Sequence, residues 1–184
     1  MEVLSEGRSG FLGFGSDEAT VRVTRIPPEG LRQDASALAQ GMLEELLSLM
    51  RISATVEQKE PSEGSAPVCL NINGDDLGIL IGRRGNTLAS LQYIVFLMVS
   101  QRLKAHMPVS IDVEGYKERR KQSLTSLAQR MAERVVSTDQ PVTMEPMPAS
   151  ERRIVHLALL DYEGVTTEST GEGDERKVTI LRQR

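Results

Sequence analysis

Two arginines enclosed by two glycines form the first pattern in this chain whose residue types could bind a ligand. The stretch Gly82-Arg83-Arg84-Gly85 stands immediately before a segment predicted to be helical. Free backbone N–H groups and the positive end of the helix dipole would therefore lie at this turn. Glycines allow a sugar-phosphate backbone to approach closely, and guanidinium groups add charge and paired donors. A purely structural glycine turn is the alternative, but two adjacent arginines favour phosphate binding.

A second pattern places Arg152 and His156 four residues apart in another predicted helix, so they share one face. Ile154, Val155 and Ala158 point roughly the other way, and we therefore expect the pair to be exposed. On the spacing alone, an ordinary solvated helix face is the favoured interpretation. A catalytic role has little support, because no nucleophile or metal cluster is organised around the histidine.

The third pattern is a local excess of positive charge. Residues 115–138 carry six basic and two acidic side chains, although the whole chain has a net charge of −4. This basic helix could continue a phosphate track, and a solvated helix is the alternative. The residues expected to support nucleic-acid binding are Lys117, Arg119, Arg120 and Lys121.

Composition narrows the function classes. With 184 residues, 39% hydrophobic and 26% charged, the chain is typical of a globular protein. Its one cysteine, Cys69, excludes an internal disulfide framework and a zinc site of several thiolates, and His106 and His156 form no short metal pair. The longest apolar run, residues 93–99, is too short to cross a bilayer. We expect a cytoplasmic protein with no metal, no cofactor and no membrane insertion.

Hydrophobic periodicity predicts an α-β-β-α-α-β order around the glycine-arginine turn. Asp34 is the expected N-cap of the first helix, whose apolar stripe is Leu38, Met42, Leu46 and Met50, joined by Leu43 and Leu49. The remaining elements are strands at 52–56 and 68–72, a short helix at 75–81, a long helix at 86–103 and a strand at 109–113.

The rest of the chain predicts a smaller second unit. A long amphipathic helix over 115–137 leads to a strand at 142–144 and to a helix that Ser150 caps. A terminal hairpin pairs residues 165–169 with 177–181. Residues 1–26 contain a short strand and a glycine-rich loop at 10–15, with too little apolar surface to fold alone.

The stretch from Ile79 to Gly85, set in that element order, resembles a KH domain of the prokaryotic topology. The loop of a KH domain clamps the backbone of single-stranded RNA. The resemblance implies RNA contacts at Gly82, Arg83, Arg84 and Gly85. The chain has only six aromatic residues, which argues against RNA binding by stacking of bases on aromatic rings. The resemblance implies instead a groove that holds bases on aliphatic side chains. Candidates for this groove are Ile72, Ile79, Leu80 and Ile81.

The stretch from Pro146 to His156 is similar to the R-three-H domain, which binds single-stranded nucleic acid through an Arg-x-x-x-His pair, here Arg152 and His156. A KH domain followed by this domain resembles the bacterial Jag family, also called KhpB or SpoIIIJ-associated, over residues 32–181. The resemblance implies an α+β fold. Its expected parts are a partial N-terminal β segment and linker at 1–30, a KH domain at 31–114 and the R-three-H domain at 115–184.

This resemblance implies a non-enzymatic, cytoplasmic protein that binds single-stranded RNA, with single-stranded DNA left open. Its role would be that of an RNA chaperone or post-transcriptional regulator in cell shape and envelope (peptidoglycan) homeostasis. The expected partner is a separate small KH protein (KhpA-like) or a second copy of the chain. The alternative is a protein-interaction scaffold associated with the machinery that inserts membrane proteins.

Overall fold

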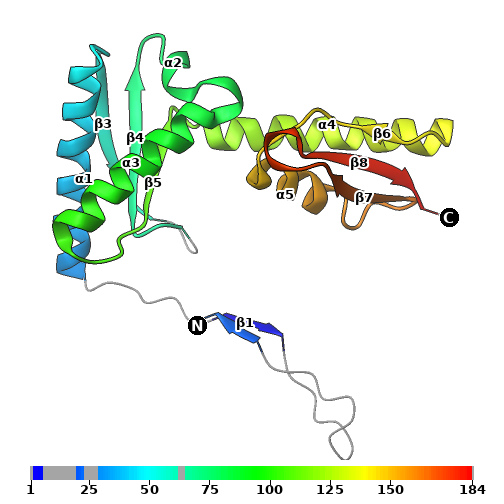
Figure 1. Cartoon of the computed structure of the whole chain (residues 1–184), viewed down its shortest axis with the longest axis horizontal. Coiled ribbons are helices and arrows are strands. Elements are labelled where there is room, and N and C mark those ends of the chain that lie inside the picture. The colour runs from blue at the N-terminus through cyan, green and yellow to red at the C-terminus, as the bar shows by residue number, and fades with distance from the viewer. Residues whose placement is uncertain (1, 6–19, 23–28, 62–64, 184) are drawn as a thin grey trace, which may run out of the picture.

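The computed structural model describes residues 2–5, 20–22, 29–61 and 65–183 of the chain. Figure 1 shows two folded units along one long helix, α4 (Tyr116–Thr138), which joins the first unit to the second. The mixture of helices and sheets confirms the predicted α+β class. The glycine-arginine turn lies in the first unit, and the Arg-x-x-x-His helix lies in the second.

The first unit has the predicted α-β-β-α-α-β order. Its sheet runs β3-β4-β5, in which β4 pairs antiparallel with β3 and parallel with β5. The chain returns between the parallel strands through helices, as such a pairing requires. The elements are α1 (Glu29–Leu49), β3 (Ala54–Lys59), β4 (Val68–Gly74), α2 (Gly78–Ile81), the 3₁₀ turn η1 (Arg83–Gly85), α3 (Asn86–Leu103) and β5 (Val109–Val113).

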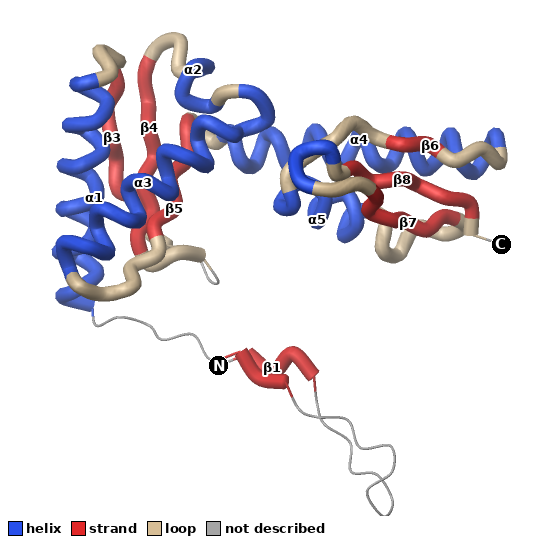
Figure 2. The backbone as a smooth tube through the Cα atoms, in the orientation of Figure 1, coloured by secondary structure: helices blue, strands red, loops and turns tan. Residues whose placement is uncertain are grey.

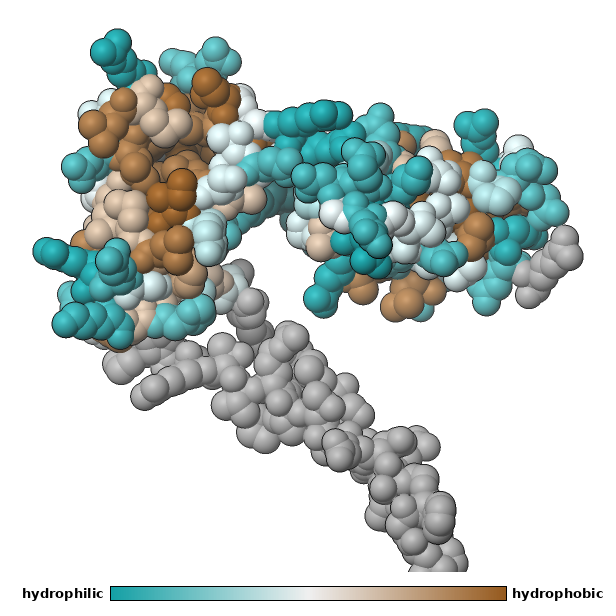
Figure 3. Space-filling model, in the orientation of Figure 1, coloured by the Kyte–Doolittle hydropathy of each residue, from teal (hydrophilic) through white to brown (hydrophobic). Residues whose placement is uncertain are grey.

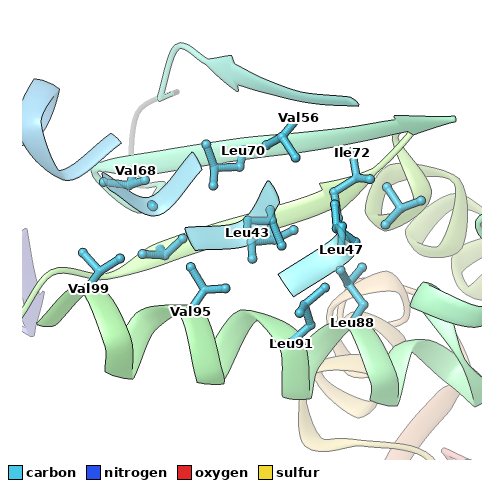
Figure 4. Close-up of a cluster of buried hydrophobic side chains, with 14 of the residues drawn as sticks. Leu43, Leu47, Val56, Val68, Leu70, Ile72, Leu88, Leu91, Val95 and Val99 are labelled. Atoms are coloured by element: carbon cyan, nitrogen blue, oxygen red, sulfur yellow. The ribbon is translucent and has the colours of Figure 1, made fainter. Parts of the chain in front are cut away.

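One face of this sheet carries the core. Along β5, Val109, Ile111 and Val113 are buried, and the residues between them are half-exposed. Figure 4 shows side chains of α1 and α3 meeting those of the strands, among them Leu43 and Val95. The period of two along the strands and the helical stripe along α3 therefore fix which way the start of α3 faces.

The predicted start of α1 is wrong, and its predicted stripe is confirmed as fully buried only at Leu43. The helix includes Glu29, so Asp34 lies inside it and is no N-cap. The fully buried row combines two alanines with two leucines: Ala35, Ala39, Leu43 and Leu47. Small side chains let the helix approach the sheet closely. The predicted stripe is mostly half-buried or, at its end, exposed: Leu38, Met42, Leu46, Leu49 and Met50.

The second unit packs two helices on one antiparallel sheet of order β6-β8-β7. Its core joins α4 and α5 to the sheet through Ala128, Val155 and Ile180. The helix α5 begins at Ala149 with Pro148 in the N-cap position, so the prediction that Ser150 caps it is wrong. The elements are α4, β6 (Val142–Thr143), α5 (Ala149–Ala158), β7 (Val165–Thr170), the 3₁₀ turn η2 (Gly173–Glu175) and β8 (Lys177–Arg182).

Near the N-terminus, two short strands pair antiparallel, with Val3 opposite Val21. They are β1 (Glu2–Ser5) and β2 (Thr20–Arg22), drawn in red near the N-terminal label of Figure 2. The glycine-rich loop at 10–15 lies outside the described residues, as does the stretch at 23–26. That residues 1–26 do not fold alone stays a prediction.

Candidate nucleic-acid interface

The turn between α2 and α3 requires glycine at its first position. Gly82 has φ 68° and ψ −173°, a backbone conformation that is essentially restricted to glycine. A Cβ atom at Gly82 would lie 2.0 Å from Oγ1 of Thr87 in the first turn of α3. The turn thus brings the backbone of residues 82–85 close to the start of that helix.

The second glycine of the turn lies against the second unit's long helix. Gly85 has φ 77°, and a Cβ there would come within 3.2 Å of the Tyr116 ring, at the start of α4. Burial raises the pKa of the Tyr116 phenol, which fits a ring packed against protein. Close packing within the protein therefore explains why both positions are glycine. The case for RNA binding rests on the two arginines between them.

The two arginines of the turn have different surroundings. Arg83 is exposed, and its guanidinium has no hydrogen-bond or ion-pair partner among the described residues. Arg84 takes a left-handed backbone conformation, with φ 55° and ψ 31°. Its half-buried guanidinium donates to the Glu145 carboxylate and to the Pro146 carbonyl, both between β6 and α5. Only Arg83 is thus available to a phosphate without breaking a contact.

The predicted aliphatic groove is partly wrong. Ile72 and Leu80 are completely buried in the core, because they lie on the inward faces of β4 and α2. Ile81 is half-buried, and Ile79 is 68% exposed. Next to the turn, Ile79 is the side chain best placed to contact a base.

The basic helix is also less open than its sequence indicates. The Lys117 ammonium donates to Gln92 Oε1 at 2.8 Å and to Ser110 Oγ at 3.0 Å. Burial of this ammonium lowers the pKa of Lys117, and the nearby Asp112 carboxylate opposes the shift. Lys117 therefore ties α4 to α3 and β5.

Two further cations of α4 are engaged within the protein. Arg119 donates to the Glu114 carbonyl. Arg120 forms a two-pronged ion pair with Glu151 of α5, with Nε–Oε1 at 2.7 Å and Nη2–Oε2 at 2.9 Å. Lys121 is exposed, and among the described residues its side chain is the one of the four predicted cations with no hydrogen-bond or ion-pair partner. A phosphate track over these four residues stays a prediction, because three of them already have partners within the protein.

Glu151 is a residue that sequence reasoning missed. Its side chain is only 8% exposed, and its hydrogen bond is the main reason that the pKa of Arg120 is raised. The pair fixes the start of α5 against the first turns of α4, close to the Gly82–Gly85 turn that Tyr116 contacts. Acidic residues are common in the first turn of a helix, so the position of Glu151 in the sequence did not indicate that it would be buried.

Arg152 and His156 are half-buried between α5 and β7, so the prediction of an exposed pair is wrong. The imidazole lies between two hydroxyls: Nδ1 is 2.6 Å from Thr167 Oγ1, and Nε2 is 2.7 Å from Ser169 Oγ. Arg152 Nη1 donates to the same Ser169 Oγ at 3.3 Å. The expected exposure came from the spacing of residues within α5 alone. That spacing does not show that β7 covers the face of α5 that carries the pair.

Burial lowers the pKa of His156, and the charge of Arg152 lowers it further. The ring is therefore neutral at pH 7, with one nitrogen donating and the other accepting. Thr167 and Ser169 were missed as members of this site. Their alternate positions in a predicted strand, on the same face as a buried valine, were the available signal.

No group of three or more His, Cys, Asp or Glu residues that could hold a metal ion is found within the described ranges. Within those ranges, no helix is long and apolar enough to cross a membrane. Figure 3 shows hydrophilic side chains gathered over the junction between the two units, near the turn.

Comparison with known proteins matches both units separately. Residues 36–113 match the KhpA/KhpB KH domain, and residues 122–182 match the R-three-H domain. A solved structure of Aquifex aeolicus Era overlaps 58% of this chain and 36% of its own, with 21% identity and a TM-score of 0.31, which is too little to support a conclusion.

Two curated relatives match along nearly the whole chain. "RNA-binding protein KhpB" of Clostridium symbiosum is 39% identical over 183 residues, which covers 100% of this chain and 79% of the relative. The protein of the same name from Bacillus subtilis (strain 168) is 34% identical over 186 residues, covering 99% and 85%. With a KH domain, an R-three-H domain and this extent of similarity, the chain belongs to the KhpB family, also called Jag.

Proposed function

We propose that this protein binds single-stranded RNA without catalysis. The observation that carries the proposal is the Gly82–Gly85 turn at the start of α3, with the unpaired guanidinium of Arg83 in the turn and the exposed Ile79 in the preceding helix α2. A phosphate can approach the glycine backbone while Arg83 supplies charge, and Ile79 offers an apolar contact to a base. The KhpB relatives are named RNA-binding proteins, which supports the same assignment.

A second contact is proposed at the α5–β7 site. Arg152 and the neutral His156 offer a cation and a hydrogen-bonding ring that β7 already orients. Such a site contributes directed hydrogen bonds to a nucleotide more than it contributes charge. Linking this site to the Gly82–Gly85 turn, hereafter the KH turn, raises the overall affinity for RNA through effective concentration, even when each contact is weak.

Arg83→Ala tests the first contact. Binding of a labelled single-stranded RNA should weaken, and the slope of log K against log salt should flatten by about 0.7 for one lost phosphate contact. Arg102→Ala is the matched control, because Arg102 is an exposed cation at the far end of α3. Equal affinity of wild type and Arg83→Ala, with normal folding of both, would contradict the proposal.

The absence of catalysis is tested on the same RNA. The purified protein should leave it intact with and without divalent metal ions. Turnover that disappears in His156→Ala would show that the α5–β7 site is catalytic.

We further propose that the protein acts in the cytoplasm as an RNA chaperone or post-transcriptional regulator in cell shape and envelope homeostasis. Support for this finer role comes from the family resemblance. Crosslinking in cells followed by sequencing of the bound RNA tests it. Enrichment of transcripts for envelope synthesis, lost in Arg83→Ala, is the expected result, and equal recovery of RNA from both proteins would oppose it.

The proposed partner is a small, separate KH protein of the KhpA type, with self-association as the alternative. The matched KH domain is shared by KhpA and KhpB. Tyr93, Ile94 and Leu97 of α3 are 60%, 47% and 46% exposed, and Figure 3 shows a hydrophobic patch over this side of the first unit. Leu97→Asp should abolish co-purification of such a partner and leave RNA binding by the isolated chain intact.

The same apolar side chains are the specific observation that favours the second candidate function, a scaffold associated with the membrane-insertion machinery. Under that function, Leu97→Asp would remove the association and Arg83→Ala would have no effect on it. The two substitutions thus separate the candidates.

A further inference from the structure

We propose that Glu145 is a built-in competitor of RNA for Arg84, so that RNA binding at the KH turn releases the segment between β6 and α5. This inference rests on the proposed function. The guanidinium of Arg84 already holds a carboxylate and a carbonyl from the second unit. An RNA phosphate, like a carboxylate, presents two adjacent anionic oxygens, which the guanidinium fork can bind in pairs.

The acceptors are held in place by their neighbours. On one side, Met144 N–H donates to the Val178 carbonyl at 2.8 Å, and on the other, Met147 N–H donates to the Arg176 carbonyl at 3.1 Å. Both methionine side chains are buried in the second core. The two residues between them, Glu145 and Pro146, therefore project from an anchored backbone toward the turn.

The contact is suited to reversible competition. The Glu145 side chain is 83% exposed and that of Arg84 is 22% exposed, so water and salt reach the ion pair. Ion pairs of this kind contribute little to stability. A phosphate that also contacts Arg83 and the glycine backbone can thus displace the carboxylate.

Opening this contact leaves the two units connected. Tyr116 stays packed against Gly85, and the Arg120–Glu151 pair holds the start of α5 on α4. The change is therefore confined to the segment around Glu145. Because coupling between two binding events is reciprocal, whatever stabilises the Arg84–Glu145 contact should weaken RNA binding by the same factor.

Glu145→Gln tests the competition, since it removes the charge and keeps the shape. We expect binding of a labelled single-stranded RNA oligonucleotide to the full chain to tighten by up to about fivefold at low salt. The gain should shrink as salt rises, because salt screens the pair that is removed. Glu163→Gln is the matched control: it removes the same charge from an exposed residue in the turn between α5 and β7, and it should give a smaller gain.

A double-mutant cycle with Arg84→Ala shows whether Glu145 acts through Arg84. In the Arg84→Ala background, Glu145→Gln should change affinity no more than Glu163→Gln does. Unchanged or weaker binding by Glu145→Gln, or an equal gain in both backgrounds, would overturn the competition. If Arg83→Ala also left affinity unchanged, the proposed RNA site itself would fail; if Arg83→Ala weakened binding, only the competition would.

Discussion

The KH turn and the α5–β7 site each present arginine to solvent from the junction of a helix with a second element, but they are built differently. The turn is formed by four consecutive residues, and its free guanidinium, Arg83, is unrestrained. The α5–β7 site joins residues up to 17 positions apart, with Ser169 contacting both Arg152 and His156. The turn should therefore act through charge and backbone shape, and the α5–β7 site through fixed hydrogen bonds.

Glu151→Ala should cause the largest effect, and it should affect the α5–β7 side alone. It leaves the half-buried Arg120 without its partner, and loss of one member of a buried pair is strongly destabilising. Because Arg120 is 30% exposed, we discount the cost to about 2–3 kcal/mol of unfolding free energy. Urea unfolding measures it, with Glu118→Ala on the exposed side of α4 as control. A loss similar to that of the control would show that the pair is not structural.

Gly82→Ala should cause the next largest effect, on the turn. The left-handed backbone and the approach to Thr87 predict a cost of about 1–3 kcal/mol and a displaced turn. RNA affinity should fall with it, and the contacts of His156 should persist. Gly78→Ala is the matched control, since a Cβ at Gly78 meets no atom within 4 Å. Equal stability and affinity of the two variants would contradict the required geometry.

Ser169→Ala should have a smaller effect, again on the α5–β7 side. His156 Nε2 and Arg152 Nη1 would both lose their shared partner, at a cost of about 1 kcal/mol in a half-buried site. RNA binding should weaken, with no change in its salt dependence. Thr166→Ala removes an exposed hydroxyl of the same strand and should change neither quantity. A flatter salt slope in Ser169→Ala would show that the site acts mainly through charge.

The same difference explains what the sequence could predict. The bounds of α3 and β5, Asn86–Leu103 and Val109–Val113, were predicted correctly to the residue, because glycine and strict alternation mark them locally. The KH turn could also be predicted, because its four residues are consecutive in the sequence. The pairing of Arg84 with Glu145 could not be predicted, because it joins residues 61 positions apart through exposed side chains.

Two errors have a common physical cause. The buried stripe of α1 was predicted correctly only at Leu43, because apolar size was taken as the measure of burial, whereas the small Ala35 and Ala39 are completely buried. The exposure of Arg152 and His156 was misjudged because helical periodicity does not reveal that β7 covers their face. Both errors concern which element covers a face, and that depends on tertiary contacts.

The smallest predicted effect is the pH dependence of stability, which should arise from the α5–β7 site and not from the turn. Burial lowers the pKa of His156 in the folded protein below the ordinary value of about 6.5. The unfolded chain therefore binds more protons as the pH falls below about 6.5, and the folded state loses stability until the folded pKa is passed. The contribution of the neutral ring is complete above the unfolded pKa.

His156→Gln isolates this contribution, because it removes the titrating ring while His106 remains in both proteins. The free energy of unfolding should fall less steeply between pH 6.5 and the acid range in His156→Gln than in wild type. Arg83→Gln, which changes only the turn, should retain the wild-type slope. Identical slopes in wild type and His156→Gln would mean that the imidazole is as accessible to protons in the fold as in the unfolded chain, and β7 would then not cover it.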